Sequence, residues 1–494
     1  MINALHSLRI TLHYEKLLPS DVNKINELIE YLSPSDIDDK ILALVSKPDW
    51  DNEKNSEGHY ADKSETRAIE FAKDIITRGI DLKPLLILLL KGEQRKGFVF
   101  GKTIGELITD KNAFLTVILE KLKEIKKEEQ SPEFLSGYLQ NFTEEEQRKI
   151  IKRIIHTPEI ARNAVFLARF YLNRKEDILE LFNLIDDGIL QINELLILSY
   201  SNYLNTISVD DLKEICSKIY SYGNEGKWIT IEIISFYCHR DPKRFEIIKD
   251  YIKEIISGFN YMTNEIRVNS IDDYSYSQLV QDILKQKNEK QFACVISNHI
   301  YESLHQKRIP FTDIYIAEIS RILVEDYFED FWEILSPAIL EDGFPYWNIK
   351  YILGARQGNF DTFDSEGALF RGNYNDVILN WCKLHQPKAP LRIAYLMPIS
   401  GSENNTLCWH PFAKTIIDNF GDINGILEEI GANMHSFSWT GSTVPYYEDL
   451  KKLFEQLIKH PITQVRDWAK KNIIDLDTTI KREQIDDEER LLGL

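Results

Sequence analysis

The chain has 494 residues, 43% of them hydrophobic, which is enough to bury several domains or one long repeat array and argues against wholesale disorder. Asp and Glu number 78 against 59 Lys and Arg, so the formal net charge is −19. Non-specific DNA or RNA binding needs an excess of cations to displace phosphate counterions, so no nucleic-acid partner is expected.

Cysteine use and the lack of recognisable targeting segments predict a reducing compartment, the cytoplasm. The five cysteines form no CxxC pair, which favours buried thiols over zinc ligands or disulfides: Cys216, Cys238, Cys294, Cys382 and Cys408. The N-terminus lacks the basic and apolar regions of a signal peptide. The longest apolar run, Leu85 to Leu90, is too short to cross a membrane. We expect a cytoplasmic protein without membrane association.

Apolar residues recur at three- and four-residue spacing through most of the chain, which predicts a nearly all-α fold. The first region, residues 1–130, is expected to end in the charged segment 121–129. It contains an exposed polar loop at 49–64. Its helices are expected at residues 22–32, 65–78, 81–90 and 98–108.

Residues 131–340 are repetitive in style, with helical pairs separated by short turns such as HTPE at 156–159 and HRDP at 239–242. The pairs recur at intervals of roughly 35 to 45 residues, the range of two-helix repeats. This predicts an α-solenoid of stacked helical pairs, a superhelix of the HEAT or TPR kind. Residues 195–204 are apolar nearly all round, as suits a helix between two layers.

The last region, residues 341–494, opens with a stretch rich in Gly, Pro and aromatics at 341–371. It is expected to form a C-terminal helical unit that ends in an exposed charged helix at 481–489. Between Trp409 and Trp468, helical spacing of apolar residues surrounds a corner rich in Gly, Ser and aromatics.

Eight aromatic residues concentrate in the last third of the chain: Trp332, Tyr346, Trp347, Tyr351, Trp381, Trp409, Trp439 and Trp468. At helical spacing such residues are more often core than binding hot spots, so we expect most of them to be buried. The Gly/Ser corner is the expected exception, because it should be partly exposed. Its candidate partner-binding residues are Trp439, Gly441, Ser442, Tyr446 and Tyr447.

Two motifs raise the question of catalysis. Gly101-Lys102-Thr103 resembles the end of a phosphate-binding loop, but position 96 is Lys where that loop needs Gly. We expect instead that Gly97, Gly101 and Gly105 let two helices approach closely.

The second motif is Asp211 with Glu225 and Lys227, which resembles the acidic and basic set of a metal-dependent nuclease. Such a set belongs on a strand hairpin, whereas Asp211 starts a predicted helix and 223–226 is expected to be the loop after it. The histidines are isolated, and no catalytic signature is present. The sequence identifies no reaction and indicates no metal or cofactor.

The segment 460–476 is similar to the second helix of a HEAT-type repeat, through Pro461, Val465, Arg466 and Ala469. The last 110 or so residues resemble the C-terminal helical region of large bacterial STAND-type NTPases implicated in antiphage defence. The resemblance rests on Trp409-His410-Pro411, Phe420-Gly421-Asp422, Phe437 to Ser442, Val444 to Tyr447, and His460-Pro461 with Val465 to Ala469; Asp486 to Arg490 with Gly493 resembles that family's acidic ending.

In that family the C-terminal repeats form a sensor arm that binds a foreign protein. The resemblance therefore implies a sensor or recognition subunit whose partner is a phage protein or a subunit of the defence system. The chain lacks a phosphate-binding loop and a recognisable NTPase segment, so nucleotide-driven behaviour is not implied.

Two other functions remain open. One is a scaffold or regulator of a host protein complex with the same fold. The other is an enzyme whose site is assembled from residues distant in sequence.

Overall fold

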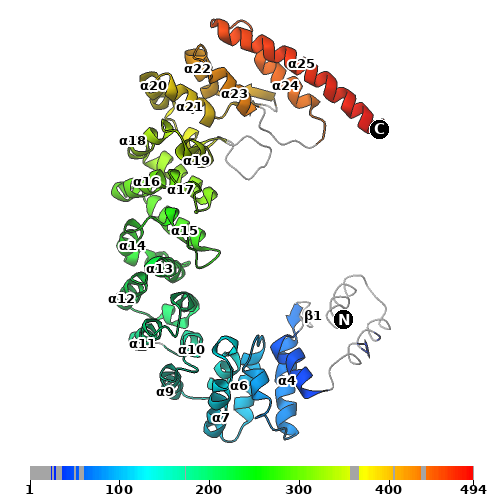
Figure 1. The fold of residues 1–494 in the computed structure, drawn as a ribbon, viewed down its shortest axis with the longest axis vertical. Coiled ribbons are helices and arrows are strands. Elements are labelled where there is room, and N and C mark those ends of the chain that lie inside the picture. Colours follow the sequence, from blue (N-terminus) through cyan, green and yellow to red (C-terminus); the bar gives the residue numbers. More distant parts are fainter. Residues whose placement is uncertain are drawn as a thin grey trace. The chain divides into compact units, whose positions relative to one another are not determined.

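The computed structural model describes residues 24, 27, 28, 36–48, 52–54, 60–172, 174–355, 366–403, 406–434 and 441–492. Over these ranges the chain is almost entirely helical, with two short antiparallel hairpins, which confirms the predicted all-α class (Figure 1). The chain divides into two compact units, residues 1–239 and 240–494. The domain boundaries expected near residues 130 and 340 stay predictions.

The first unit consists of helices of moderate length and one hairpin. Its elements are α3 Ile37–Ile41, the π-helical turn η1 Leu42–Ser46, β1 Asn52–Lys54, β2 Tyr60–Asp62, α4 Ser64–Thr77, α5 Leu86–Leu89, α6 Gly97–Leu107, α7 Lys111–Lys123, η2 Lys127–Glu129, α8 Glu133–Leu139, α9 Glu144–Ile155, α10 Asn163–Tyr171, α11 Lys175–Asp186, η3 Ile192–Tyr200, η4 Asn202–Asn205, α12 Val209–Tyr220 and α13 Gly223–Cys238.

The helices predicted at 65–78 and 98–108 are confirmed as α4 and α6, whereas that at 22–32 lies mostly outside the described residues. The helix predicted at 81–90 is wrong in length. The Asp81 carboxylate accepts a hydrogen bond from the Lys83 N–H at 3.1 Å, so the chain turns there and α5 starts at Leu86.

Two further predictions in this unit are wrong. Residues 195–204 do not form an α-helix, because η3 is a 3₁₀-helix whose buried residues Ile192, Leu195 and Leu198 recur every three positions, the period of that helix. Residues 223–226 are not a loop, since α13 begins at Gly223, whose φ of 78° lets the chain turn directly into the helix.

Close packing between α6 and α8 rests on glycine, as the sequence predicts. A Cβ added to Gly101 would lie 2.1 Å from the carbonyl oxygen of Phe134, and one added to Gly137 would lie 1.8 Å from that of Phe98. The two backbones therefore touch where a side chain would otherwise hold them apart. Gly101-Lys102-Thr103 lies inside α6 and forms no phosphate-binding loop.

A buried ion cluster joins α9 to α11. The Asp177 side chain is 0% exposed, and its carboxylate accepts hydrogen bonds from Nη2 of Arg148 at 2.7 Å and from Nε of the same group. Lys152 Nζ lies 3.1 Å from Asp177 and 2.8 Å from Glu180. Burial opposes ionisation of Asp177, but these hydrogen bonds outweigh it and lower the pKa of the carboxyl.

The second unit contains α14 Pro242–Ser257, η5 Tyr261–Thr263, α15 Asp272–Leu284, α16 Lys290–Leu304, α17 Asp313–Asp326, α18 Phe328–Ile339, α19 Phe344–Leu353, η6 Ala368–Phe370, α20 Asn375–Leu384, α21 Lys388–Leu396, β3 Ser400–Glu403, β4 Thr406–Trp409, α22 Pro411–Phe420, α23 Ile426–Met434, α24 Val444–Glu455 and α25 Thr463–Leu492. The expected charged helix end at 481–489 is confirmed as part of α25.

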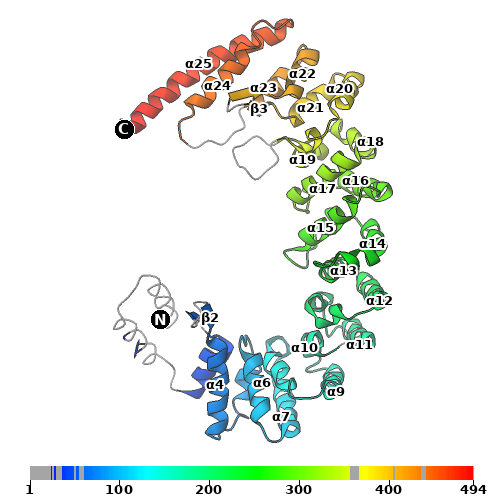
Figure 2. The same cartoon turned by 180° about the vertical axis from the view of Figure 1, so that it is seen from behind.

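Alternate helices of this unit pack against one another. Helices α15, α17, α19, α21 and α23 form one layer, in which each contacts the next, and α14, α16 and α18 form another. Both views show α15, α17 and α19 on one side and α14, α16 and α18 on the other (Figures 1 and 2). We call the first set the odd layer.

Substitution of Gly101 by Ala should destabilise the chain by more than about 2 kcal/mol, because the added methyl meets the Phe134 backbone. Gly431→Ala in α23 is the matched control, since its Cβ would meet only the Trp468 ring at 3.8 Å. That substitution should be neutral or stabilise by about 0.5 kcal/mol. Denaturant unfolding followed by circular dichroism measures both, and an equal effect would contradict the close contact.

Asp177→Asn should cost about 3 kcal/mol at pH 7, because it leaves Arg148 and Lys152 without their buried counter-ion. The folded pKa of Asp177 is depressed, so the stabilisation is present above the unfolded pKa of about 3.9 and is lost as pH falls through the folded pKa. The difference in unfolding free energy between the two proteins should therefore shrink at pH 3. Glu145→Gln, in an exposed pair with Lys149, is the control with little effect. A difference that is the same at both pH values would refute this account.

Candidate functional site

The corner that the sequence marks for partner binding includes the start of α24, while Trp439 lies outside the described residues. Gly441 has a φ of 95°. The Ser442 hydroxyl donates a hydrogen bond to Asp487 of α25, and the Tyr446 hydroxyl donates to the carbonyl of Met434 at 3.0 Å. The described part of the corner therefore ties α24 to α25 and to the end of α23.

The two tyrosines of the corner, Tyr446 and Tyr447, are half-buried. Their ring centroids lie 5.8 Å apart in an edge-on arrangement. Burial, together with the neighbouring Tyr447, raises the pKa of Tyr446 to about 12, so its hydroxyl stays protonated and remains a donor. Partner binding by Gly441, Ser442, Tyr446 and Tyr447 stays a prediction.

The expectation that the C-terminal aromatics are mostly core is confirmed for Trp332 and Trp409, whereas Trp381 and Trp468 are half-buried. Trp409 is 6% exposed, and its Nε1 donates to the Leu453 carbonyl at 3.0 Å. Trp468 packs edge-on against Phe454 with centroids 4.9 Å apart, and Trp332 is buried against Trp381.

The same expectation is wrong for Trp347 and Tyr351 of α19, which lie on one exposed face with Phe344. Phe344, Trp347 and Tyr351 are 46%, 58% and 59% exposed. They stand at positions i, i+3 and i+7, so they share one face of the helix. The opposite face, which includes Ile349 and Leu353, is buried. Helix α19 is thus apolar on both sides although only one side enters the core.

Two tyrosines at the starts of neighbouring helices of the odd layer are also partly exposed. Tyr274 is the third residue of α15 and is 49% exposed, and Tyr315 is the third residue of α17 and is half-buried. Their ring centroids lie 6.2 Å apart. We call Tyr274, Tyr315, Phe344, Trp347 and Tyr351 the aromatic row.

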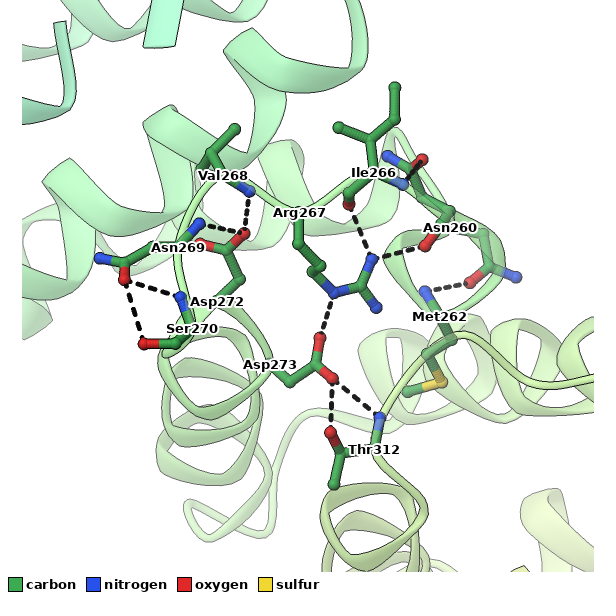
Figure 3. Close-up of polar contacts among 11 residues, drawn as sticks. Asn260, Met262, Ile266, Arg267, Val268, Asn269, Ser270, Asp272, Asp273 and Thr312 are labelled. Carbon is green, nitrogen blue, oxygen red and sulfur yellow. Dashed lines mark hydrogen bonds and ion pairs between the residues drawn. The ribbon is translucent and has the colours of Figure 1, made fainter. Parts of the chain in front are cut away.

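A polar network holds the starts of α15 and α17 side by side (Figure 3). The Asp273 carboxylate accepts from Nε of Arg267 at 2.6 Å, and its other oxygen accepts from both the backbone N–H and the hydroxyl of Thr312, at 2.8 and 2.7 Å. Arg267 also donates to the carbonyls of Asn264 and Ile266. Because Thr312 directly precedes α17, this one carboxylate aligns the first turns of the two helices.

A cation–aromatic stack joins α19 to α21. The Arg392 guanidinium lies 3.9 Å from the centroid of the Tyr346 ring, and that ring stacks on Tyr395 at 4.7 Å. Arg392 and Lys388 both pair with Asp342, just before α19. The stack fixes α19 against α21 and leaves the exposed face of α19 uninvolved in that contact.

Lys350 is the titratable group most altered by this arrangement. Its Nζ donates to the carbonyl of Tyr395, near the C-terminus of α21, and lies 5.0 Å from the Tyr395 ring. Burial lowers its pKa to about 8, against the opposing field of Glu429. Burial raises the pKa of Glu429 in turn. A group of this kind can occur at a functional site or in a structural network, so it identifies no reaction by itself.

The nuclease-like set is not assembled as such a site requires. Asp211 lies in the first turn of α12, where its carboxylate accepts from Ser208 and pairs with Lys175 at 3.0 Å. Glu225 and Lys227 lie on α13, a helix and not a strand. Among the described residues, no three His, Cys, Asp or Glu side chains gather to hold a metal ion. None of the described helices has the length and apolar character needed to span a bilayer.

The aromatic row was missed by sequence reasoning, although its i, i+3, i+7 spacing on α19 is visible in FPYWNIKY. That spacing matches a core stripe equally well. The opposite face, with Ile349 and Leu353, is apolar too, and a helix that is apolar on both faces is usually buried on both, so the sequence held no signal for the exposure of this one.

No protein-family model, curated protein or solved structure matches this chain.

Trp347→Ala should change the unfolding free energy by less than about 1 kcal/mol, because most of that side chain is already in solvent. Trp409→Ala should cost about 3 to 5 kcal/mol, because it empties a buried site and removes the bond to Leu453. Denaturant unfolding of the two variants compares them directly. A large loss for Trp347→Ala would mean that this ring belongs to the core.

Proposed function

We propose that this chain is a helical-repeat module that binds another protein through the aromatic row. The observation that carries the proposal is the exposure of Phe344, Trp347 and Tyr351 on one face of α19. Large aromatic side chains gathered on a surface are typical of protein-binding hot spots, where burial against a partner removes them from water. The Arg392 stack keeps the helix that carries them rigid, which lowers the entropy lost on binding.

The proposal includes an α-solenoid arrangement of stacked helical pairs. In the second unit each helix of the odd layer contacts the next, and α14, α16 and α18 do the same. Hydrogen bonds also recur between residues about one repeat apart, as between Asp273 and Thr312 or between Tyr301 and Glu341. Solenoids present extended surfaces for protein recognition, in keeping with a binding role.

A photo-crosslinking amino acid in place of Trp347 tests binding in cells that make the chain. We expect a discrete adduct with one partner protein. The matched control carries the same amino acid at Leu384, which is 80% exposed on α20, outside the odd layer. Equal labelling from both positions, or none from Trp347, would refute the proposed surface.

A more specific role, recognition of a phage protein in antiphage defence, rests on the resemblance of the C-terminal segment. In that segment Val465 and Ala469 are 0% exposed, as the interlayer face of a HEAT-type repeat requires. Arg466 donates to the carbonyls of His460 and Pro461, so it closes the turn before α25. These contacts support a HEAT-type repeat. The defence role itself rests only on the resemblance to the STAND-type NTPases.

The same crosslinking separates the defence role from that of a host regulator. An adduct that forms only in phage-infected cells, together with loss of phage protection on deleting the chain, supports a sensor. An adduct already present in uninfected cells supports a scaffold or regulator of a host complex, and unchanged plaque counts would refute the defence role.

A further inference from the structure

We propose that Asn424 is a site of spontaneous deamidation, where the side-chain amide is converted to aspartate and isoaspartate with water as the only other reactant. Asn424 and Gly425 lie in the turn between α22 and α23. The inference is independent of the aromatic row and of any partner protein, so its test does not depend on the proposed function.

The reaction uses the backbone nitrogen of the residue that follows the asparagine. This nitrogen attacks the side-chain carbonyl carbon, Cγ, and a five-membered succinimide ring forms. The amide nitrogen leaves as ammonia and takes with it the proton of the attacking N–H. Water then adds to one of the two ring carbonyls and opens the ring. One opening gives aspartate, and the other gives isoaspartate, in which the main chain runs through the side-chain carbon.

The first requirement of this chemistry is a small residue after the asparagine. A Cβ on the attacking residue hinders ring closure, and glycine has none. Asn-Gly occurs in the sequence at 424–425, and Asp-Gly occurs at 187–188 and 342–343. An ionised aspartate is a poor electrophile, because its carboxylate already carries a negative charge. The sequence therefore marks 424–425 as the most reactive of these pairs.

The second requirement is that neither reacting group is held by a hydrogen bond. Within the described chain, the Gly425 N–H and the Asn424 side chain make no hydrogen bond. The bonds that close the turn lie on either side of the pair. The Ile423 N–H donates to the Phe420 carbonyl at 2.9 Å, and the Ile426 N–H donates to the Ile423 carbonyl at 3.3 Å. Both groups that react are therefore available.

The third requirement is access to water together with freedom of the peptide to rotate. Asn424 is exposed to solvent. Gly425 has a φ of 91°, a conformation that glycine adopts without strain. The peptide between these two residues must rotate before Cγ can reach the nitrogen. The bond from Ile426 across the turn is longer than usual, at 3.3 Å, so it restrains that rotation only weakly.

The two Asp-Gly pairs lack these properties. The Gly188 N–H donates to the Ile185 carbonyl at 2.9 Å, so its nitrogen is held away from the side chain of Asp187. The Asp342 carboxylate is paired with Lys388 and Arg392. Neither pair has a free amide to lose, and each has one of its reacting groups engaged.

Two nearby asparagines are restrained and serve as internal controls. The amide of Asn419 donates to the Thr415 carbonyl at 2.8 Å, and the amide of Asn433 donates to the Ala394 carbonyl at 3.1 Å. Phenylalanine follows the first and methionine follows the second, so a large side chain opposes ring closure at both. Both should remain amides while Asn424 reacts.

Deamidation changes the entry to α23 in two ways. Either product adds a negative charge two residues before the helix, where the helix dipole favours an anion. Isoaspartate also lengthens the main chain by one carbon. A Cβ added to Gly425 would already lie 3.4 Å from Leu391 of α21, so the longer chain is placed beside the contact between α21 and α23.

The test incubates the full folded chain at pH 8 and 37 °C and follows positions 419, 424 and 433 in the same sample by peptide mass spectrometry. Asn424 should be converted about ten times faster than either control, or more, because it is exposed and unrestrained. Asn424→Gln should show no comparable product, because glutamine must close a larger, six-membered ring. Equal rates at 424 and 419 would overturn the inference.

A second measurement separates the effect of the turn from that of the Asn-Gly pair alone. The same incubation in guanidinium chloride gives the rate at 424 in the unfolded chain. The folded chain should react at no less than about a tenth of that rate, because a group in an open turn needs little or no unfolding to react. A slower folded rate would mean that the turn protects the pair, and it would overturn the inference even if the unfolded chain reacts.

Discussion

The alignment of α15 with α17, and with it the contact between Tyr274 and Tyr315, depends on the carboxylate of Asp273. One oxygen holds Arg267, which also donates to the carbonyls of Asn264 and Ile266 in the loop before α15. The other oxygen accepts two hydrogen bonds from Thr312, the residue before α17. A carboxylate with three donors is held in one orientation. The first turns of both helices, and so Tyr274 and Tyr315, are therefore in register.

Several charged groups in the second unit connect neighbouring helices. Asp342 holds Lys388 and Arg392, and Arg392 in turn covers the face of Tyr346. Lys350 satisfies a carbonyl near the end of α21, as does the amide of Asn433. Helix ends leave such carbonyls without intrahelical partners, so these side chains complete α21 and fix its contact with α19. The low pKa of Lys350 follows from that structural position.

How much could be predicted from the sequence differs between local and long-range features. The all-α class and the close approach at Gly101 follow from periodicity and from glycine placement, which are properties of a short stretch. The three-residue period of η3 is also present in the sequence, in the spacing of Ile192, Leu195 and Leu198. The surrounding apolar residues make this segment look like an α-helix that is apolar on all sides. The short α5 depends on the turn at Asp81, which competes with the helix.

The site was harder to predict because exposure is decided by neighbours. The Gly/Ser corner is partly exposed, as its composition predicts, since Gly441 and Ser442 are exposed and Tyr446 is half-buried. The sequence did not predict that Ser442 and Tyr446 bond to α25 and to the end of α23. Trp347 looked like core by its spacing, yet the layer places it outside. Which of two apolar faces is buried depends on where α17 and α21 lie, and that information is spread over residues far apart in the chain.

Helix α19 does not need its exposed aromatics in order to fold. Pro345, Ile349, Ile352 and Leu353 already bury one face against the rest of the unit, and the Arg392 stack holds a second side through Tyr346. A large apolar side chain left in water forgoes about 1.5 to 3 kcal/mol of burial and adds to the risk of association. Phe344 and Trp347, which are 46% and 58% exposed, each carry about half of that cost on one face. Their burial against a partner would recover it, so the feature that folding leaves unexplained is the one that binding would use.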